Sequence, residues 1–294
     1  MADLALTLIM AVWGSSFAIL RSLMGDDAAS PLALVAVRMA MASLLLLAYL
    51  AVFRRSQLRM SRVLLRDGIF AGALLGIGFL LQTEGLQRTT ASRSGFLTGT
   101  LVVLTPLIEF AVFRKRPAAP ALAGVLLAFL GMTLLSAPWS DSSQTTLLGD
   151  SLTLGCAVVF AAQIVALGRI APKHPVLPLL LLQLATIAAV AIAAGPLVET
   201  QHFSGAPRLW GALAYLALFA TLLAFGIQTW AQKILPPVRV ALISALEPVF
   251  AALWAALLIG ERLTGRELLG GAVIVLGVVL GEAGAALRAR RALP

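Results

Sequence analysis

Charge is what this sequence has least of. Only 12% of its 294 residues are Asp, Glu, Lys or Arg, whereas 60% are apolar. That charged share is about half the value typical of soluble proteins. A soluble domain of this length needs many more charged residues on its surface. The composition argues against a soluble enzyme, a nucleic-acid binder and a disordered chain. Together with a mean hydropathy of +0.98, it favours an all-α integral membrane protein.

Cysteine and histidine are also scarce. Cys156 is the only cysteine and lies inside an apolar run, so the chain can form no internal disulfide. The two histidines, His174 and His202, lie in different connecting segments. Without a Cys/His cluster, we expect neither a zinc nor an iron site, and we expect no other cofactor.

Several catalytic motifs are missing as well. The chain has no GxxxxGK[ST] sequence, so ATP is not expected to drive it directly. It has no GxSxG or HExxH sequence. An enzyme acting on lipids or peptides within the membrane remains an alternative, but it would need clustered catalytic groups. We therefore expect a protein that is not an enzyme.

Long apolar stretches recur along the whole chain. The N-terminal one carries Asp3 and no Lys or Arg before its apolar run, so we expect it to stay as a membrane span and not to act as a signal peptide. Each stretch is long enough to cross a hydrocarbon core of about 30 Å at about 1.5 Å per residue. The ten predicted spans are 4–23, 32–53, 68–87, 94–113, 118–137, 147–168, 176–197, 209–231, 238–259 and 268–287.

The net charge of +9 is interpreted as a topology signal, because the basic residues lie in short gaps between spans. With the N-terminus inside, the inner segments hold 15 of the 22 Lys and Arg residues and the outer ones hold six. Arg38 lies within a span. This bias predicts a multi-pass protein of the inner (plasma) membrane with both termini cytoplasmic. The lipid bilayer and a small-molecule substrate are its expected partners. Nucleic acid is not an expected partner, and no oligomer is required.

The sequence contains a weak internal repeat. Shifted by 146 residues, Gln82-Thr83 aligns with Gln228-Thr229 and Leu130-Gly131 with Leu276-Gly277. We predict two five-helix repeats, residues 1–146 and 147–294. An odd number of crossings makes the second repeat enter the membrane from the opposite side. Such inverted repeats are typical of secondary transporters, with the substrate site at the repeat interface. A duplication kept only for stability is the alternative.

Glycine and proline recur at regular places within the spans. Glycines that share a helix face allow close helix packing in lipid; they are Gly68, Gly72, Gly76, Gly124, Gly131, Gly270, Gly277 and Gly281. Pro106 and Pro248 lie inside the fourth and ninth spans, where each frees a carbonyl and bends the helix. We leave open whether each is a static kink or a hinge for alternating access.

Charged residues within spans are costly and need an explanation. The acids near span ends are expected to be solvated or paired; they are Glu84, Glu109, Asp150 and Glu282. Arg38 either extends outward to the headgroups or faces a wet cavity, where it would attract a carboxylate. Glu247 is the deepest acid and directly precedes Pro248. It either lines the cavity, binding an ammonium group or a proton, or braces the kink through a hydrogen bond.

Neutral polar and aromatic residues also gather at mid-depth. Apolar and aromatic walls with a few amides and hydroxyls suit a small amphipathic solute better than a bare ion or a sugar phosphate. Each residue could instead serve as a helix–helix contact. The candidate substrate-binding residues are Trp13, Ser16, Phe17, Arg38, Phe79, Gln82, Thr98, Phe160, Gln163, Phe225, Gln228, Ser244 and Glu247.

Two motifs resemble those of a known family. Trp13-Gly14-Ser15-Ser16-Phe17 in the first span, and Glu247-Pro248 followed by Gly260-Glu261-Arg262, are similar to the ten-span EamA branch of the drug/metabolite transporter superfamily. The first half departs from this pattern, because Leu101-Val102 stands at the shifted position of Glu247-Pro248. The resemblance implies secondary export or exchange of small metabolites and drugs. The polar–aromatic lining is similar to YddG-like exporters of aromatic and neutral amino acids. A multidrug or other metabolite exporter of the same fold and a passive channel are the alternatives.

Overall fold

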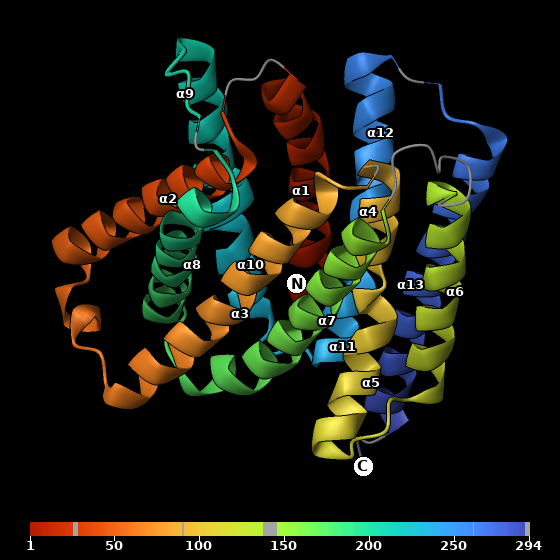
Figure 1. Cartoon of the computed structure of the whole chain (residues 1–294). Helices are drawn as coiled ribbons and strands as arrows, with labels where there is room; N and C mark the ends of the chain where they lie inside the picture. Colours follow the sequence, from red (N-terminus) through yellow and green to blue (C-terminus); the bar gives the residue numbers. More distant parts are fainter. Residues whose placement is uncertain (26–28, 90, 138–145, 201, 261, 292–294) are drawn as a thin grey trace.

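The computed structural model describes the whole chain except residues 26–28, 90, 138–145, 201, 261 and 292–294 (Figure 1). The described residues fold into helices and connections, with one isolated antiparallel bridge between Ala29 and Phe203. The continuous long helices are α1 (Ala2–Gly25), α2 (Pro31–Phe53), α3 (Arg62–Leu86), α6 (Ala119–Ser136), α7 (Leu147–Ile170), α8 (Val176–Val198) and α13 (Gly265–Arg291).

Three of the predicted spans are interrupted helices. They are α4 (Ala91–Gly99) with α5 (Leu101–Phe113), α9 (Pro207–Tyr215) with the π-helix η3 (Leu216–Leu223) and α10 (Ala224–Ala231), and α11 (Pro237–Ser244) with α12 (Glu247–Ile259). Two short 3₁₀ helices, η1 (Arg55–Leu58) and η2 (Ala171–Lys173), lie in connections.

Eight of these segments are long and apolar enough to cross a membrane. They correspond to the second to ninth predicted spans. Within the described residues, α1 contributes the apolar stretch Ala2–Ser16, and α13 is not among the eight. The chain is therefore a multi-pass helical membrane protein, and the crossings by α1 and α13 stay predictions.

The described helices surround two large hydrophobic cores and two smaller ones. One large core is built from buried side chains of α1, α5, α6, α11 and α13, on the right in Figure 1. The other large core is built from α2, α3, α8 and the η3–α10 segment, on the left. Trp13 of α1 packs against both large cores, so α1 lies between the two groups of helices.

The closest helix crossing joins α6 and α13 and is made by glycines. A Cβ on Gly124 would lie 2.5 Å from the Gly277 carbonyl oxygen, and one on Gly131 would lie 2.6 Å from that of Gly270. Backbone therefore touches backbone, as the glycine spacing predicts. Because the residue numbers rise along α6 as they fall along α13, the two helices are antiparallel.

Glycines also set the crossing of α3 with α8. Gly68 packs on Leu182, Gly72 on Gln183 and Thr186, and Gly76 on Val190. The residue numbers of the contacting pairs rise together along both helices, so α3 and α8 run in the same direction. The predicted glycine face of the third span is thus a packing surface.

Each acid that was expected near a span end is paired. Asp150 bonds Arg93 at 2.7 Å, and Glu84 pairs with Arg88 one turn away. Glu109 lies 3.9 Å from Lys115. Arg239, at the start of α11, pairs with Glu282 of α13 and with Asp3 of α1. The first turn of α1 and the later part of α13 therefore lie at the same end of the bundle.

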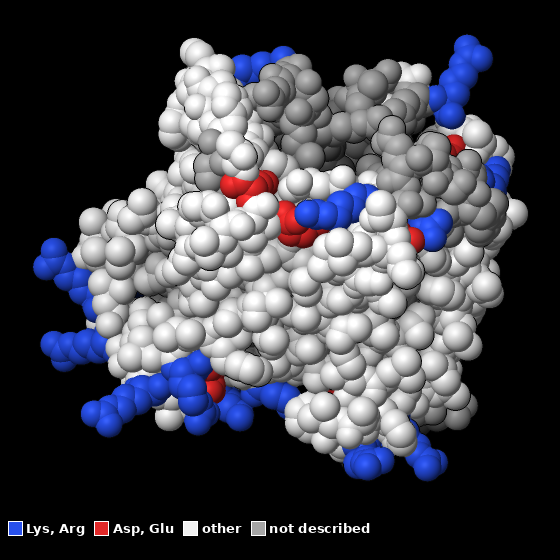
Figure 2. Space-filling model, in the orientation of Figure 1, with Lys and Arg blue, Asp and Glu red and all other residues white. Residues whose placement is uncertain are grey.

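A second set of connections meets at the other end. The Glu199 carboxylate accepts hydrogen bonds from the backbone N–H groups of Leu32 and Ala33, which begin α2. The Thr146 N–H donates to the Arg88 carbonyl at 3.0 Å, which joins the start of α7 to the end of α3. Figure 2 shows Lys and Arg side chains gathered along the opposite, lower end of the visible face, where the connections after α2 and α5 lie in Figure 1.

Candidate functional site

Four aromatic side chains from four helical segments meet at the core built from α2, α3, α8 and the η3–α10 segment. Phe79 of α3 lies edge-on to Phe160 of α7, with ring centroids 5.5 Å apart, and 6.4 Å from Phe225 of α10. Phe225 in turn lies 5.3 Å from Trp13 of α1. Each pair has the tilted or edge-to-face geometry that aromatic rings prefer. The structure thus brings together the four aromatic candidates whose side chains it describes.

The Phe17 side chain lies outside the described residues. The indole N–H of Trp13 donates to the Ala220 carbonyl at 2.8 Å, inside the π-helix η3. This bond fixes one edge of the aromatic cluster to an irregular backbone segment. Ser16 donates to the Trp13 carbonyl within α1 and stays on its own helix.

Arg38 of α2 is the charged member of this cluster. Its side chain is 7% exposed, and its guanidinium carbon lies 5.6 Å from the centre of the Phe79 ring. Nε has no hydrogen-bond partner, and no described acid lies within ion-pairing distance of Arg38. Of the two interpretations left open by the sequence, this burial favours a position facing the interior, and the role of Arg38 stays a prediction. The Phe79 ring face supplies only part of the stabilisation that the guanidinium loses when it is buried away from water.

Glu247 begins α12, directly after the break between α11 and α12. Its side chain is half-buried, and among the described residues it makes no hydrogen bond or ion pair. The described part of the chain therefore shows no hydrogen bond by which Glu247 would brace the kink, and the role of Glu247 stays a prediction. The carboxylate is left available at the mid-point of a broken helix.

The helix breaks lie close to both predicted proline positions. Pro248 is the second residue of α12, where its missing N–H costs nothing. Pro106 lies inside α5, six residues after the break at Thr100. Hinge motion at Pro106 and Pro248 stays a prediction.

The amide candidates fall into two groups. Gln163 is 1% exposed and donates to Gln183 at 3.4 Å, and Gln183 donates to Thr229 at 3.4 Å. These bonds join α7, α8 and α10, so Gln163 serves here as a helix–helix contact. Gln228 is buried and its Oε1 has no hydrogen-bond partner, which leaves it free to accept from a solute.

The remaining candidates are not brought into the aromatic cluster by any contact described. Ser244 donates to the Val240 carbonyl at the end of α11. Gln82 and Thr98 are half-buried on α3 and α4.

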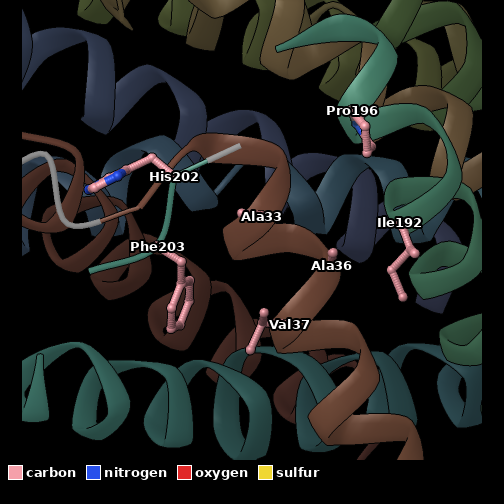
Figure 3. Close-up of a pocket in the computed structure, with 7 residues that line it drawn as sticks. All are labelled: Ala33, Ala36, Val37, Ile192, Pro196, His202 and Phe203. Atoms are coloured by element: carbon pink, nitrogen blue, oxygen red, sulfur yellow. The ribbon is translucent and has the colours of Figure 1, made fainter. Parts of the chain in front are cut away.

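Two pockets are formed elsewhere. An apolar one of about 310 Å³ opens between α2 and α8 (Figure 3) and is lined by Ala33, Ala36, Val37, Ile192, Pro196, His202 and Phe203. A polar one of about 390 Å³ lies where α5, α7 and α10 end, beside Lys115, Arg169 and Lys233. Neither contains a residue of the predicted lining, so the central cavity stays a prediction.

Comparison with known proteins identifies the family. The sequence model of the EamA-like transporter family matches residues 1–137 and again residues 147–281. The chain belongs to this family. It is therefore a transporter of the drug/metabolite transporter superfamily, as the motifs around Trp13 and Glu247 indicate.

Relatives of this EamA-like transporter extend over nearly its whole length. A transporter from Archaeoglobus fulgidus is 32% identical and covers 95% of this chain and 85% of its own. A "Probable amino-acid metabolite efflux pump" from Salmonella typhimurium is 27% identical, over 96% of this chain and 94% of its own length. The inner membrane transporter YedA of Escherichia coli is 27% identical, over 94% of this chain and 89% of its own length.

A solved crystal structure has the same fold as this EamA-like transporter. The TM-score is 0.80 at 21% sequence identity, over 100% of this chain and 99% of the other. At that identity the likeness concerns the fold alone.

Sequence reasoning missed several features of this EamA-like transporter. Tyr215 exchanges a hydrogen bond with Ser15 at 2.8 Å, and the indole of Trp254 donates to the Ala11 carbonyl at 2.9 Å. The π-helix η3 has no local sequence signal, since Leu216–Leu223 is an ordinary apolar run. The polar pocket was missed because its residues come from three separate parts of the chain, at the ends of α5, α7 and α10.

Proposed function

We propose that this protein is a secondary transporter that exports small amphipathic metabolites, with aromatic and neutral amino acids as its substrates. The observation that carries the proposal is Arg38, a buried guanidinium that pairs with none of the described acids and lies on the face of Phe79. A carboxylate would supply the paired hydrogen bonds that Arg38 lacks. The aromatic rings beside it would enclose an apolar side chain.

Two inverted repeats, residues 1–146 and 147–294, provide the frame of this proposal. The helix bounds support it: α5 and α12 begin 146 residues apart, at Leu101 and Glu247, and α6 and α13 begin 146 residues apart, at Ala119 and Gly265. The family model matches once in each repeat.

The glycine contacts between α6 and α13 support the same symmetry. Gly124 and Gly131 correspond to Gly270 and Gly277 under the 146-residue shift. The contact of Gly124 with Gly277 is therefore the symmetry mate of the contact of Gly131 with Gly270. A self-complementary pair of this kind is what a two-fold axis produces. Because the two helices are antiparallel, the axis lies across them, in the plane of the membrane.

The orientation follows from the basic residues and is part of the proposal. We place both termini and the Arg-rich connection after α2 on the cytoplasmic side of the inner membrane. The contacts of Arg239 with Asp3 and Glu282 support one common face for the two ends. The name of YedA as an inner membrane transporter supports the compartment.

The substrate class has support from both the site and a relative. The Salmonella protein is named as a probable amino-acid metabolite efflux pump. In this chain, Arg38 would bind the carboxylate, and Glu247 the ammonium group or a proton. The two repeats would rock about the breaks near Pro106 and Pro248, so that the chamber opens to each side in turn.

Counterflow in proteoliposomes tests this function. Vesicles containing only this protein are loaded with one unlabelled amino acid, and entry of the labelled form is followed for a panel that includes phenylalanine and leucine. The proposal expects saturable exchange that unlabelled solute accelerates. Flux without saturation or exchange would identify a channel. Exchange of cationic drugs but of no amino acid would identify a multidrug exporter.

The change Glu247→Gln tests the coupling role of this acid. The amide keeps the size of the side chain but cannot release a proton, so efflux driven by a pH gradient should fall by roughly tenfold or more. Exchange of one substrate for another at equal pH should persist. The matched control is Glu84→Gln, because Glu84 is paired with Arg88 at the end of α3. An unchanged pH dependence in the Glu247 variant would remove the proton-carrier role.

A further inference from the structure

The polar pocket at the ends of α5, α7 and α10 has an unusual lining. It encloses about 390 Å³, which is within the range of roughly 300–1,000 Å³ found for small-molecule sites. Five polar side chains line it, two from helices α5 and α7 and three from the connections after α5 and α10: Glu109, Arg169, Lys115, Gln232 and Lys233. None of them belongs to the aromatic cluster around Arg38.

Two buried acceptor atoms in this pocket receive no hydrogen bond from the described residues. Glu109 is 4% exposed and Gln232 is 1% exposed. Oε1 of each side chain makes no hydrogen bond. The Gln232 amide nitrogen is already used, because it donates to the Ile164 carbonyl at 2.7 Å. Lys115 is 3.9 Å from Glu109 Oε1, too far for a hydrogen bond. Buried acceptors without donors are costly, so this part of the pocket fits a group that carries several N–H donors.

Basic groups line the same pocket. The Lys233 ammonium donates one bond to the His174 carbonyl at 2.9 Å and has two further donors. The Arg169 guanidinium carbon lies 4.2 Å from the centre of the Phe113 ring, which orients its plane. Lys115 is largely exposed at the rim. The pocket therefore offers anion-binding donors beside cation-binding acceptors.

We propose that this pocket is a second, entry site that binds a free amino acid as its zwitterion. The ammonium group would bind Glu109 and Gln232, and the carboxylate would bind the Lys115, Arg169 and Lys233 donors. The inference rests on the proposed function and adds a loading site apart from the central one. The headgroup of phosphatidylethanolamine also joins an ammonium group to an anion, so the test separates the two sources.

A cysteine at the pocket rim reports on its occupancy. Pro172 lines the pocket and is exposed, whereas the native Cys156 is buried and should stay silent. In the Pro172→Cys protein, purified in maltoside detergent without phosphatidylethanolamine, the rate of maleimide labelling is measured against leucine concentration. Leucine should slow the labelling. N-acetyl-leucine lacks the ammonium group and leucinamide lacks the carboxylate, so both should protect poorly. The matched control is Lys173→Cys, which is exposed beside the pocket and should show no protection.

Second changes in the Pro172→Cys protein locate the ligand. Adding Glu109→Gln should raise the half-protecting leucine concentration by roughly tenfold, since it removes a charge-assisted hydrogen bond. Adding Lys115→Gln, at an exposed position that tolerates change, should also weaken protection by leucine but not by leucinamide. Adding Arg38→Gln should leave protection unchanged.

Four results would overturn the entry site. In the first, Arg38→Gln abolishes protection and Glu109→Gln does not. In the second, leucine, N-acetyl-leucine and leucinamide protect equally; in the third, leucine gives no protection while counterflow persists. In the fourth, protection is seen only in bilayers containing phosphatidylethanolamine. Absence of both protection and counterflow for every amino acid would instead defeat the proposed function on which the site rests.

Discussion

Replacing Arg38 with Gln is expected to abolish exchange of amino acids while leaving the fold intact. Arg38 is buried, its Nε has no partner, and no described acid pairs with it. Removing a buried ion usually destabilises a protein because its partner is left uncompensated. Because none of the described acids would be left uncompensated, thermal stability should be unchanged or higher.

The loss of transport should be large. A bidentate guanidinium–carboxylate contact contains two charge-assisted hydrogen bonds, each contributing about 1.5–3 kcal/mol. At about 1.4 kcal/mol per tenfold change, the exchange of leucine should fall by at least about 100-fold. Arg38→Lys should recover only part of it, since an ammonium group cannot reproduce the planar fork.

Counterflow at subsaturating substrate measures this effect. Leucinamide, which lacks the carboxylate, should be exchanged equally by the wild-type protein and the Arg38→Gln variant. The matched control is Arg116→Gln, at an exposed position after α5. If Arg38→Gln exchanges leucine at the wild-type rate, the carboxylate is bound elsewhere. If it fails to fold, Arg38 is a structural residue.

The second large effect is expected at the α6–α13 crossing. In Gly131→Leu, the new Cβ would lie 2.6 Å from both the Gly270 oxygen and the Ile274 nitrogen. Both are backbone atoms of α13, so no side chain can rotate away, and the helices must separate. Overpacking of this kind costs about 1–3 kcal/mol or more. In lipid, no hydrophobic force between helices compensates for the lost contact.

Thermal unfolding in detergent, followed by size-exclusion chromatography, measures the outcome. Gly131→Leu should lower the melting temperature by on the order of 5–10 °C or yield no monodisperse protein. Gly277→Leu should have a similar effect, because a Cβ there would lie 2.7 Å from the Gly124 oxygen and 2.8 Å from the Ala128 nitrogen. Gly211→Leu is the control, since nothing lies within 4 Å of a Cβ there. A Gly131→Leu protein that melts like the wild type would refute the close crossing.

The helices themselves could be predicted because their signal is local. Apolar runs of about 20 residues give the spans, and glycines four or seven apart mark packing faces such as those of α3 and α13. The ends of α2 and α8 agree with the predicted ranges 32–53 and 176–197 to within a residue or so. Prolines also indicate breaks, although α4 ends at Gly99, seven residues before Pro106, and not at the proline.

The site could be predicted only in part, because its signal is non-local. Aromatic and polar residues at mid-depth identified Trp13, Phe79, Phe160 and Phe225, which meet. The same criterion selected Gln163, which bonds Gln183 and joins helices instead. Only tertiary structure shows which side of a helix each residue faces. The π-helix η3 depends on tertiary contacts such as the bond from Trp13 to the Ala220 carbonyl, and no residue pattern within Leu216–Leu223 indicates it.

The central claim, a chamber around Arg38 that opens to each side in turn, is tested most directly by the accessibility of Gln82→Cys. Gln82 is half-buried on α3, close to one turn after Phe79, and the native Cys156 is buried. A membrane-impermeant thiol reagent is applied from either side, using right-side-out and inside-out vesicles. We predict labelling from both sides, with substrate changing the two rates in opposite directions. Labelling from one side only, or two rates that substrate changes in the same direction, would contradict alternating access.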